Sequence, residues 1–311
     1  MLHVFAVLAA ALLFGTTGTS QALGPDGTTP LSIGVMRMVI GGTGLALLAF
    51  LLAWRQRARL PLDAPARPRL SIRPLSLMVL TGFCLALYQP LFFLGTARNG
   101  VAVGTVVALG SAPILAGLLE WMLTRRVPSG VWMLATGLAT IGVVLLGFGG
   151  EAGGTGGTDP IGILGSIGAG ASFAVIANAQ RRLLDSGWDP FTVVGAMGAS
   201  SAALSVVVLP FVDVSWFTTT AGLVMALWLG LATISIAYVM FTWGLNGLTA
   251  ATAATLTLGE PLTASILGIV VLGERLSLLA ILGLVVLACG LALLAWGSRS
   301  PRDAKPFAVE A

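Results

Sequence analysis

One acidic side chain, Glu260, lies in the middle of a long apolar stretch of this chain. Residues 250–273 contain no other Asp, Glu, Lys or Arg, and they are long enough to cross a bilayer core of about 30 Å because a helix rises about 1.5 Å per residue. A carboxylate at that depth is costly and usually faces a polar cavity or a partner. Glu260 is therefore a candidate for binding a proton or the amine of a small molecule. The alternative is structural: Glu260 could hydrogen-bond the backbone near Pro261, whose missing N–H leaves one carbonyl unpaired.

A cation has a comparable setting at Arg37, inside the apolar stretch 31–53. By helix rise, Arg37 lies about 9 Å from the end of that stretch. Its guanidinium presents parallel donors that suit a carboxylate, so Arg37 is a candidate for binding an acidic group of a small molecule. The alternative is that its long side chain extends to the membrane interface or ties helix ends together.

Four uncharged polar side chains also lie inside apolar stretches, at Tyr88, Gln89, Asn178 and Tyr238. Buried amides and phenols need hydrogen-bonding partners, which a water-filled cavity would supply. Tyr88 and Gln89 directly precede a proline, which interrupts the regular bonding of a helix. We therefore predict that these four side chains line the same cavity as the two charged ones.

The residue types that most often build metal sites and catalytic centres are scarce. The only histidine is His3, and the two cysteines, Cys84 and Cys289, lie in apolar stretches without metal-ligand spacing. The chain contains neither a His-Glu-x-x-His nor a Gly-x-Ser-x-Gly motif. We therefore expect no metal site, no disulfide, no cofactor and no enzymatic activity.

The composition indicates an all-α integral membrane protein. Of 311 residues, 57% are hydrophobic and 9% are charged, whereas soluble domains have about 25% charged residues. The N-terminal stretch could be a cleaved signal peptide, but it lacks a basic start and an Ala-x-Ala site, so we predict a helix there. The ten predicted membrane-crossing helices cover residues 2–21, 31–53, 75–97, 101–123, 131–149, 161–180, 190–212, 219–242, 248–272 and 277–296.

Basic residues predict the orientation of these helices, because Lys and Arg are enriched in cytoplasmic loops. With the N-terminus inside, thirteen of the sixteen Lys and Arg residues fall in inner loops or the tail, and two, Arg98 and Arg275, fall in outer loops. Arg37 lies within a helix. The split predicts a protein that crosses its membrane ten times with both termini cytoplasmic.

The two halves of the chain repeat each other. An offset of 148 residues pairs Pro113 with Pro261, Gly142 with Gly290, and Ala112 with Glu260. A shift of one residue in the offset pairs Asn99 with Asn246, and earlier in the chain Phe14 corresponds roughly to Phe173. Each half then holds five helices, and because five is odd, the second half enters the membrane from the opposite side. We predict two inverted repeats, which are typical of secondary transporters with a site between the halves.

These residues resemble the EamA family of the drug/metabolite transporter superfamily. The similarity rests on Gly-Glu-Pro-Leu followed by Leu-Gly-Glu-Arg-Leu-Ser within residues 258–277, and on Arg37 seven residues after Pro30. The resemblance implies ten helices around a central cavity, a location in the plasma (inner) membrane, and the export or exchange of small metabolites such as amino acids. The first half departs from the pattern, with Arg125-Arg126 in place of an acidic and basic pair. A coupling carboxylate is therefore expected in the second half.

The resulting domain prediction is a first EamA-like repeat at 1–149, a Gly-rich linker at 150–160, a second repeat at 161–297 and a cytoplasmic tail at 298–311. The expected partners are a small-molecule substrate and the lipid bilayer, with no nucleic acid, and the oligomeric state stays open. The function we expect is export of amino acids or related carboxylated and amine compounds by alternating access, with Glu260 as the candidate proton-coupling group. The alternatives are efflux of cationic drugs and a membrane scaffold that transports nothing.

Overall fold

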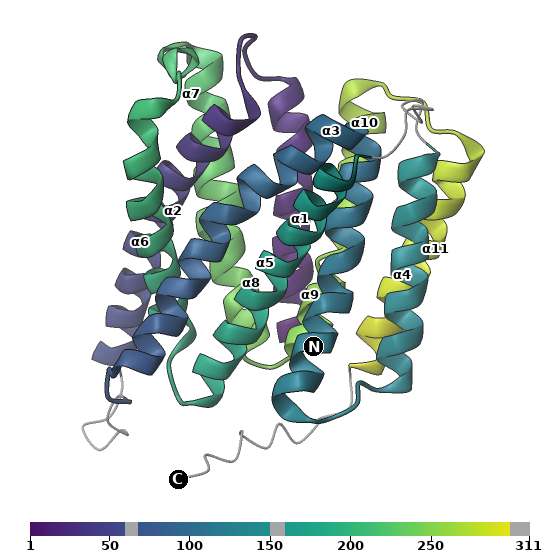
Figure 1. Cartoon of the computed structure of the whole chain (residues 1–311). Coiled ribbons are helices and arrows are strands. Elements are labelled where there is room, and N and C mark those ends of the chain that lie inside the picture. The colour runs from purple at the N-terminus through teal and green to yellow at the C-terminus, as the bar shows by residue number, and fades with distance from the viewer. Residues whose placement is uncertain (60–67, 150–158, 299–311) are drawn as a thin grey trace.

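Ten long apolar helices form one bundle (Figure 1), as expected from the sequence. A computed structural model describes residues 1–59, 68–149 and 159–298, and within these ranges every regular element is helical. Almost all of the predicted linker 150–160 and tail 298–311 lies outside the described residues. The boundaries of the predicted repeats therefore stay predictions.

The helices follow the predicted stretches closely. In chain order they are α1 Leu2–Ala22, α2 Pro30–Ala58, α3 Ile72–Thr124, α4 Gly130–Phe148, α5 Pro160–Asp185, α6 Pro190–Val208, η1 Leu209–Phe211, η2 Ser215–Thr218, α7 Thr220–Leu227, η3 Trp228–Ile236, α8 Ala237–Leu245, α9 Ala250–Leu256, α10 Gly259–Leu272 and α11 Leu278–Gly297.

We number the ten membrane-crossing segments as spans 1 to 10 in chain order. The long helix α3 contains spans 3 and 4, which Gly100 separates with a φ of 78°. Glycine adopts this left-handed conformation without the steric cost that a Cβ would add. Span 7 is α6 with η1, span 8 is α7, η3 and α8 together, and span 9 is α9 with α10.

Local sequence signals determine where three of these helices begin. Thr29, Asp159 and Asp189 each precede a proline at the start of a helix, where a missing backbone N–H costs nothing. Each of the three side chains accepts a hydrogen bond from a backbone N–H of the first helical turn, as an N-cap residue does. The beginnings of α2, α5 and α6 are thus readable from short motifs.

Spans 8 and 9 are irregular inside the membrane. The middle of span 8, Trp228–Ile236, is a π-helix. This form is rare in proteins, and where it occurs it is often at a functional site. Span 9 is interrupted at Thr257 and Leu258, between α9 and α10. The Leu258 N–H donates a hydrogen bond to Thr255 O at 3.1 Å, and the Thr257 hydroxyl donates to Ala254 O at 2.7 Å. Both irregular segments lie beside the cavity described below.

Glycines let pairs of helices from the two halves approach closely. A Cβ on Gly142 of α4 would lie 2.7 Å from Gly283 O of α11, and a Cβ on Gly283 would lie 2.7 Å from Gly142 O. Gly42 of α2 and Gly198 of α6 have the same reciprocal relation, at 2.8 and 2.7 Å. Such reciprocal contacts between spans 2 and 7 and between spans 5 and 10 are what a two-fold axis between the halves would give.

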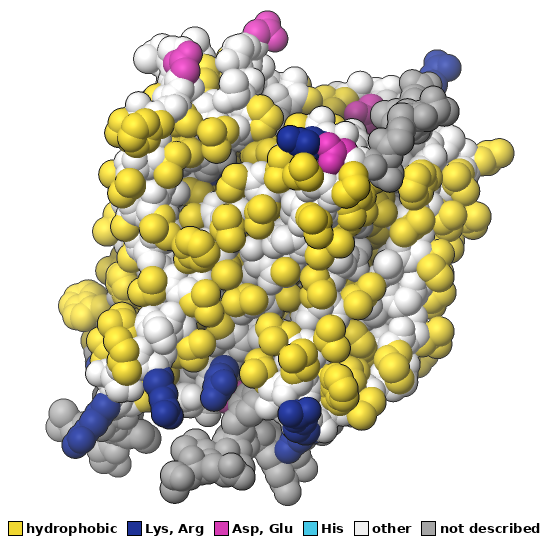
Figure 2. Space-filling view, in the orientation of Figure 1, with side chains coloured by type: hydrophobic (Ala, Val, Ile, Leu, Met, Phe, Trp, Pro, Cys, Tyr) yellow, Lys and Arg dark blue, Asp and Glu magenta, His cyan; other side chains and the backbone are white. Residues whose placement is uncertain are grey.

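The outer surface of the bundle matches a bilayer. Hydrophobic side chains cover its flank, and Lys and Arg side chains gather at the end where α2 ends and α4 begins (Figure 2). The opposite end shows acidic as well as basic side chains. The protein is therefore a multi-pass membrane protein, and its two ends differ in charge in the way that the loop sequences predict.

Polar contacts tie the turn between spans 8 and 9 to span 6. Arg181 of α5 donates through Nη1 to the carbonyls of Leu245, Asn246 and Leu248, at 2.8, 2.9 and 3.0 Å. Its Nη2 also forms an ion pair of 2.6 Å with Asp185. These bonds hold the ends of three spans together on the basic side of the bundle.

The turn between spans 3 and 4 is tied to span 6 at the opposite end. Arg98 forms an ion pair of 2.8 Å with Asp159, and the Asp159 N–H donates to Asn99 Oδ1 at 2.7 Å. The hydrogen bond from Arg98, with that from the Ile161 N–H, holds the pKa of the Asp159 carboxyl below its ordinary value. Asn99 and Asn246 pair in the sequence repeat; Asn99 follows Arg98 in the chain, and the carbonyl of Asn246 accepts a hydrogen bond from Arg181.

Candidate functional site

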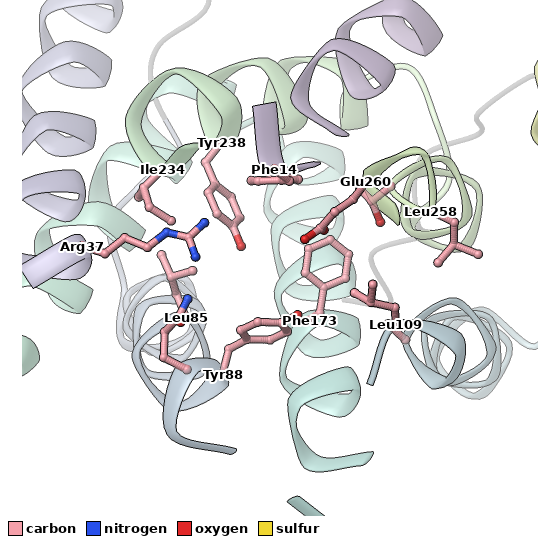
Figure 3. A pocket seen from close by; sticks show the side chains of 13 residues that line it. Phe14, Arg37, Leu85, Tyr88, Leu109, Phe173, Ile234, Tyr238, Leu258 and Glu260 are labelled. Carbon is pink, nitrogen blue, oxygen red and sulfur yellow. The ribbon is translucent and has the colours of Figure 1, made fainter. Parts of the chain in front are cut away.

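A small cavity lies at the centre of the bundle, between the two halves of the chain. Its volume is about 50 Å³, which has room for water molecules but not for a metabolite. It is lined by residues of spans 1, 2, 3, 4, 6, 8 and 9 (Figure 3), namely Phe14, Arg37, Leu85, Tyr88, Gln89, Leu109, Ala112, Phe173, Ile234, Tyr238, Thr257, Leu258 and Glu260.

Arg37 extends from α2 into this cavity (Figure 3) rather than to the membrane interface. Its Nε donates to Thr233 Oγ1 at 3.2 Å, and its Nη2 donates to Thr17 Oγ1 at 3.4 Å. Thr233 belongs to the π-helix of span 8, so that irregular segment places the acceptor that orients the guanidinium. Of five N–H donors, the guanidinium uses two on hydroxyls of the described residues, which leaves donors for a bound anion.

Glu260 enters the cavity from the other side, in the first turn of α10. Its backbone N–H donates to Thr257 O at 2.9 Å. Because span 9 is interrupted, α10 begins inside the membrane, and a helix N-terminus favours negative charge nearby. Among the described residues the Glu260 carboxylate has no hydrogen bond or ion pair, so the structural alternative of bonding to nearby backbone finds no support.

Arg37 and Glu260 do not form an ion pair with each other. The described residues contain two ion pairs, Arg98–Asp159 and Arg181–Asp185, and neither involves the cavity. Figure 3 shows the two charged groups on opposite sides of the open space, with Tyr88 and Tyr238 between them. A ligand between them would meet a cation at one end and an acid at the other.

Aromatic rings form much of the remaining wall. The rings of Phe14 and Tyr238 meet edge to face with centroids 5.3 Å apart, and Tyr88 stacks on Phe92 at 6.0 Å. Phe173 contacts Phe241 at 5.5 Å. These contacts fix the rings, and rings of this kind offer apolar faces to a ligand and, through the two phenols, polar edges.

The two halves contribute unequally to this wall. Phe14 and Phe173, which pair in the sequence repeat, both line the cavity. Ala112 and Glu260 also pair in the repeat and also line it. The cavity thus has related positions on both sides, but only the second half carries a carboxylate there, in agreement with the departure of the first half from the repeated pattern.

Five of the six predicted site residues line the cavity, and Asn178 does not. Its amide donates to Ala116 O at 3.1 Å and to Ala174 O at 3.0 Å, so it ties span 6 to span 4. Sequence reasoning missed Phe14, Phe173 and the hydroxyl of Thr233. Apolar and small hydroxyl side chains are common in membrane helices, and nothing in their spacing separated these three from the rest.

The described residues contain no group of three or more His, Cys, Asp or Glu that could hold a metal ion. The polar groups that line the cavity are one guanidinium, one carboxyl group, two phenols, one amide and the hydroxyl of Thr257. Such groups can bind and release charged small molecules and protons.

Comparison with known proteins gives a consistent result for both halves of the chain. The sequence model of the EamA-like transporter family matches residues 1–148 and again residues 160–296. An uncharacterized transporter of Bacillus subtilis (strain 168), YwfM, is 39% identical over 299 residues, which cover 96% of this chain and 95% of that protein. A solved crystal structure of a protein with 19% identity superposes with a TM-score of 0.75 and covers 96% of this chain and 97% of the other. The last similarity concerns the fold alone.

Proposed function

The chain belongs to the EamA-like transporter family, and from this we propose that it moves small molecules carrying both a carboxylate and an amine, most simply amino acids, across the membrane. The family and the Bacillus relative make it a membrane transporter in general terms. The substrate class, the export direction and the coupling are our proposal.

The observation that carries the substrate class is the pair of charged groups in the central cavity. Arg37 can offer parallel N–H donors to a carboxylate, and Glu260 can accept hydrogen bonds from an ammonium group. Neither group is neutralised by an ion pair within the described residues. A zwitterion placed between them would neutralise both charges at once, which offsets the cost of burying charge.

The position of Arg37 also bears on the choice between this substrate class and cationic drugs. A cavity for cations would be served by an aromatic wall and a single carboxylate, both of which are present. A guanidinium in the same cavity repels a cation that has no acidic group. The arrangement therefore favours carboxylated substrates over purely cationic ones.

The cavity must widen to accept such a substrate, because ligand sites are commonly about 300 Å³ or more. Rocking of the two five-span halves about the centre would widen it toward one side of the membrane at a time. Glu260 is the proposed site of the coupling proton, since it is the acid among the lining residues. We place the basic end of the bundle in the cytoplasm of the cell, in the plasma (inner) membrane, with both termini inside.

The direct test is uptake of a radiolabelled amino-acid panel into vesicles that contain the purified protein, with and without a pH gradient. Basic, acidic and neutral members, together with a lipophilic cation that has no carboxylate, separate the two substrate classes. We expect protein-dependent uptake of at least one zwitterion and none of the cation. Uptake of the cation alone would favour drug efflux, and uptake of no member would favour a scaffold or another substrate class.

A further inference from the structure

A second cavity lies on the flank of the bundle, between α2, α3 and α6. Its volume is about 330 Å³, several times that of the central cavity. Its walls include Leu31 and Val35 of α2, Ala86 and Leu87 of α3, and Leu204 and Val208 of α6. Apart from Gln89 and Ser205, the lining has no polar side chain capable of strong hydrogen bonding. We call this cavity the flank groove.

The sequence keeps this groove open in two ways. Pro90 has no N–H for the carbonyl of Ala86, one turn earlier, and both residues line the groove. Gly34 lies opposite, where a Cβ would come within 3.2 Å of the Gln89 Cβ. A larger residue at Gly34 would therefore press on Gln89, so the absence of a side chain there leaves space between α2 and α3.

The mouth of the groove faces the hydrocarbon of the bilayer. Three lining residues, Leu31, Phe83 and Val207, are 45%, 48% and 68% exposed, and all three lie within membrane-crossing spans. Water is a poor occupant of most of the groove, because each buried water needs two to four polar partners, and the two polar side chains of the lining, Gln89 and Ser205, could together serve about one water. In a bilayer, the opening of the groove is in contact with the acyl chains of lipids.

We propose that the flank groove between α2, α3 and α6 binds one acyl chain of a bilayer lipid. The chain fills an apolar space that neither water nor another part of the described protein fills. Its end reaches Gln89, which is 7% exposed and also lines the central cavity. One residue thus belongs to both walls, and the bound chain supports Gln89 from the hydrocarbon side. This inference does not depend on which molecule the protein transports.

The test uses a lipid that reports where its acyl chain lies. The full-length protein is placed in phosphatidylcholine nanodiscs in which a small share of the lipid carries a diazirine in the middle of one acyl chain. After irradiation, mass spectrometry of peptides measures the adducts at each residue. We expect Val35 and Leu87 to be labelled about tenfold more than exposed apolar residues of α11 such as Val285, the ratio that a preference of roughly 1.4 kcal/mol gives.

Variants that fill the groove from two sides identify the site. Ala86→Phe and Val208→Phe should each reduce labelling of the groove to the level of α11 while the protein remains monodisperse in gel filtration. Ala292→Phe, at an exposed alanine of α11, is the matched control and should leave groove labelling unchanged. Equal labelling of the groove and α11 in the wild type would overturn the proposal. Wild-type labelling of the groove in Ala86→Phe or Val208→Phe, with the variant still folded, would also overturn it.

Discussion

At the scale of single residues, Arg37 is the side chain whose setting says most about the substrate. It is oriented by hydroxyls from two other spans, Thr17 and Thr233, and it retains donors that face the cavity. A guanidinium held in this way is ready to bind a carboxylate in two parallel hydrogen bonds, which a lysine ammonium cannot reproduce.

Arg37→Lys should therefore weaken binding of carboxylated substrates while keeping the positive charge. We expect the half-saturation concentration to rise about tenfold, equivalent to roughly 1.4 kcal/mol, with the pH dependence of transport unchanged. Initial rates of uptake across a range of substrate concentrations measure this effect. Arg55→Lys, in the last turn of α2 at the basic end, is the control and should behave as wild type.

An unchanged half-saturation concentration in Arg37→Lys would mean that the guanidinium has a structural role. Its role would then be to hydrogen-bond Thr17 and Thr233, and another group would have to bind the substrate's carboxylate.

Polarity explains which residues of the site could be predicted from sequence. Arg37 and Glu260 stand out because charge is rare inside apolar stretches, and both line the cavity. Asn178 stands out for the same reason, but two backbone carbonyls satisfy its amide away from the cavity. The sequence reports that a buried polar group needs a partner, and it does not report whether that partner is the protein or a ligand.

At the scale of helices, small residues control how closely the two halves pack. A Cβ on Gly142 would lie 2.5 Å from Leu287 N and 2.7 Å from Gly283 O. These are backbone atoms of α11, which cannot move independently of their helix. Any side chain at Gly142 must therefore push spans 5 and 10 apart.

Gly142→Ala should destabilise the protein by about 1–3 kcal/mol, the usual cost of overpacking a tight contact. Gly137→Ala, in the same helix, is the matched control because a Cβ there meets nothing within 4 Å. That change should be neutral or stabilising by up to about 1 kcal/mol, since alanine favours helix more than glycine does. The amount of monodisperse protein left after heating in detergent measures both, and equal losses in the two variants would contradict this packing.

Helix positions could be predicted from sequence, but the irregular segments could not. Apolar length and N-cap motifs located all ten spans to within a few residues. The π-helix at Trp228–Ile236 and the break at Thr257 depend on packing against other spans and leave weak signals. Gly259 and Pro261 hinted at the break, because they surround Glu260 with one flexible residue and one lacking an N–H.

At the scale of the whole molecule, the distribution of charge predicts how the bundle sits in the membrane. Single cysteines can test it after Cys84 and Cys289 are replaced by serine or alanine. A cysteine at Arg69, on the basic side, should react with a membrane-impermeant maleimide only when the membrane is opened, whereas a cysteine at Asp26, exposed in the turn between spans 1 and 2, should react in intact cells.

Because both positions lie in connections between spans, neither substitution disturbs the packed core. Reaction of both cysteines from outside would contradict the single crossing, span 2, that separates the two positions, and reaction of Arg69→Cys alone would show the opposite orientation.

We propose that the cavity between the halves couples a proton at Glu260 to the movement of a zwitterion. The measurement is accumulation of a radiolabelled amino-acid substrate in vesicles, driven by a pH gradient, alongside exchange of labelled for unlabelled substrate without a gradient. Glu260→Gln keeps the shape of the side chain but cannot take up or release a proton. Glu274→Gln, in the turn between spans 9 and 10, is the control for removal of an acid.

We expect the wild type and Glu274→Gln to accumulate substrate against its gradient, and Glu260→Gln to exchange substrate without accumulating it. Accumulation by Glu260→Gln at the wild-type rate would show that another group carries the proton, and Glu260 would then have no part in coupling.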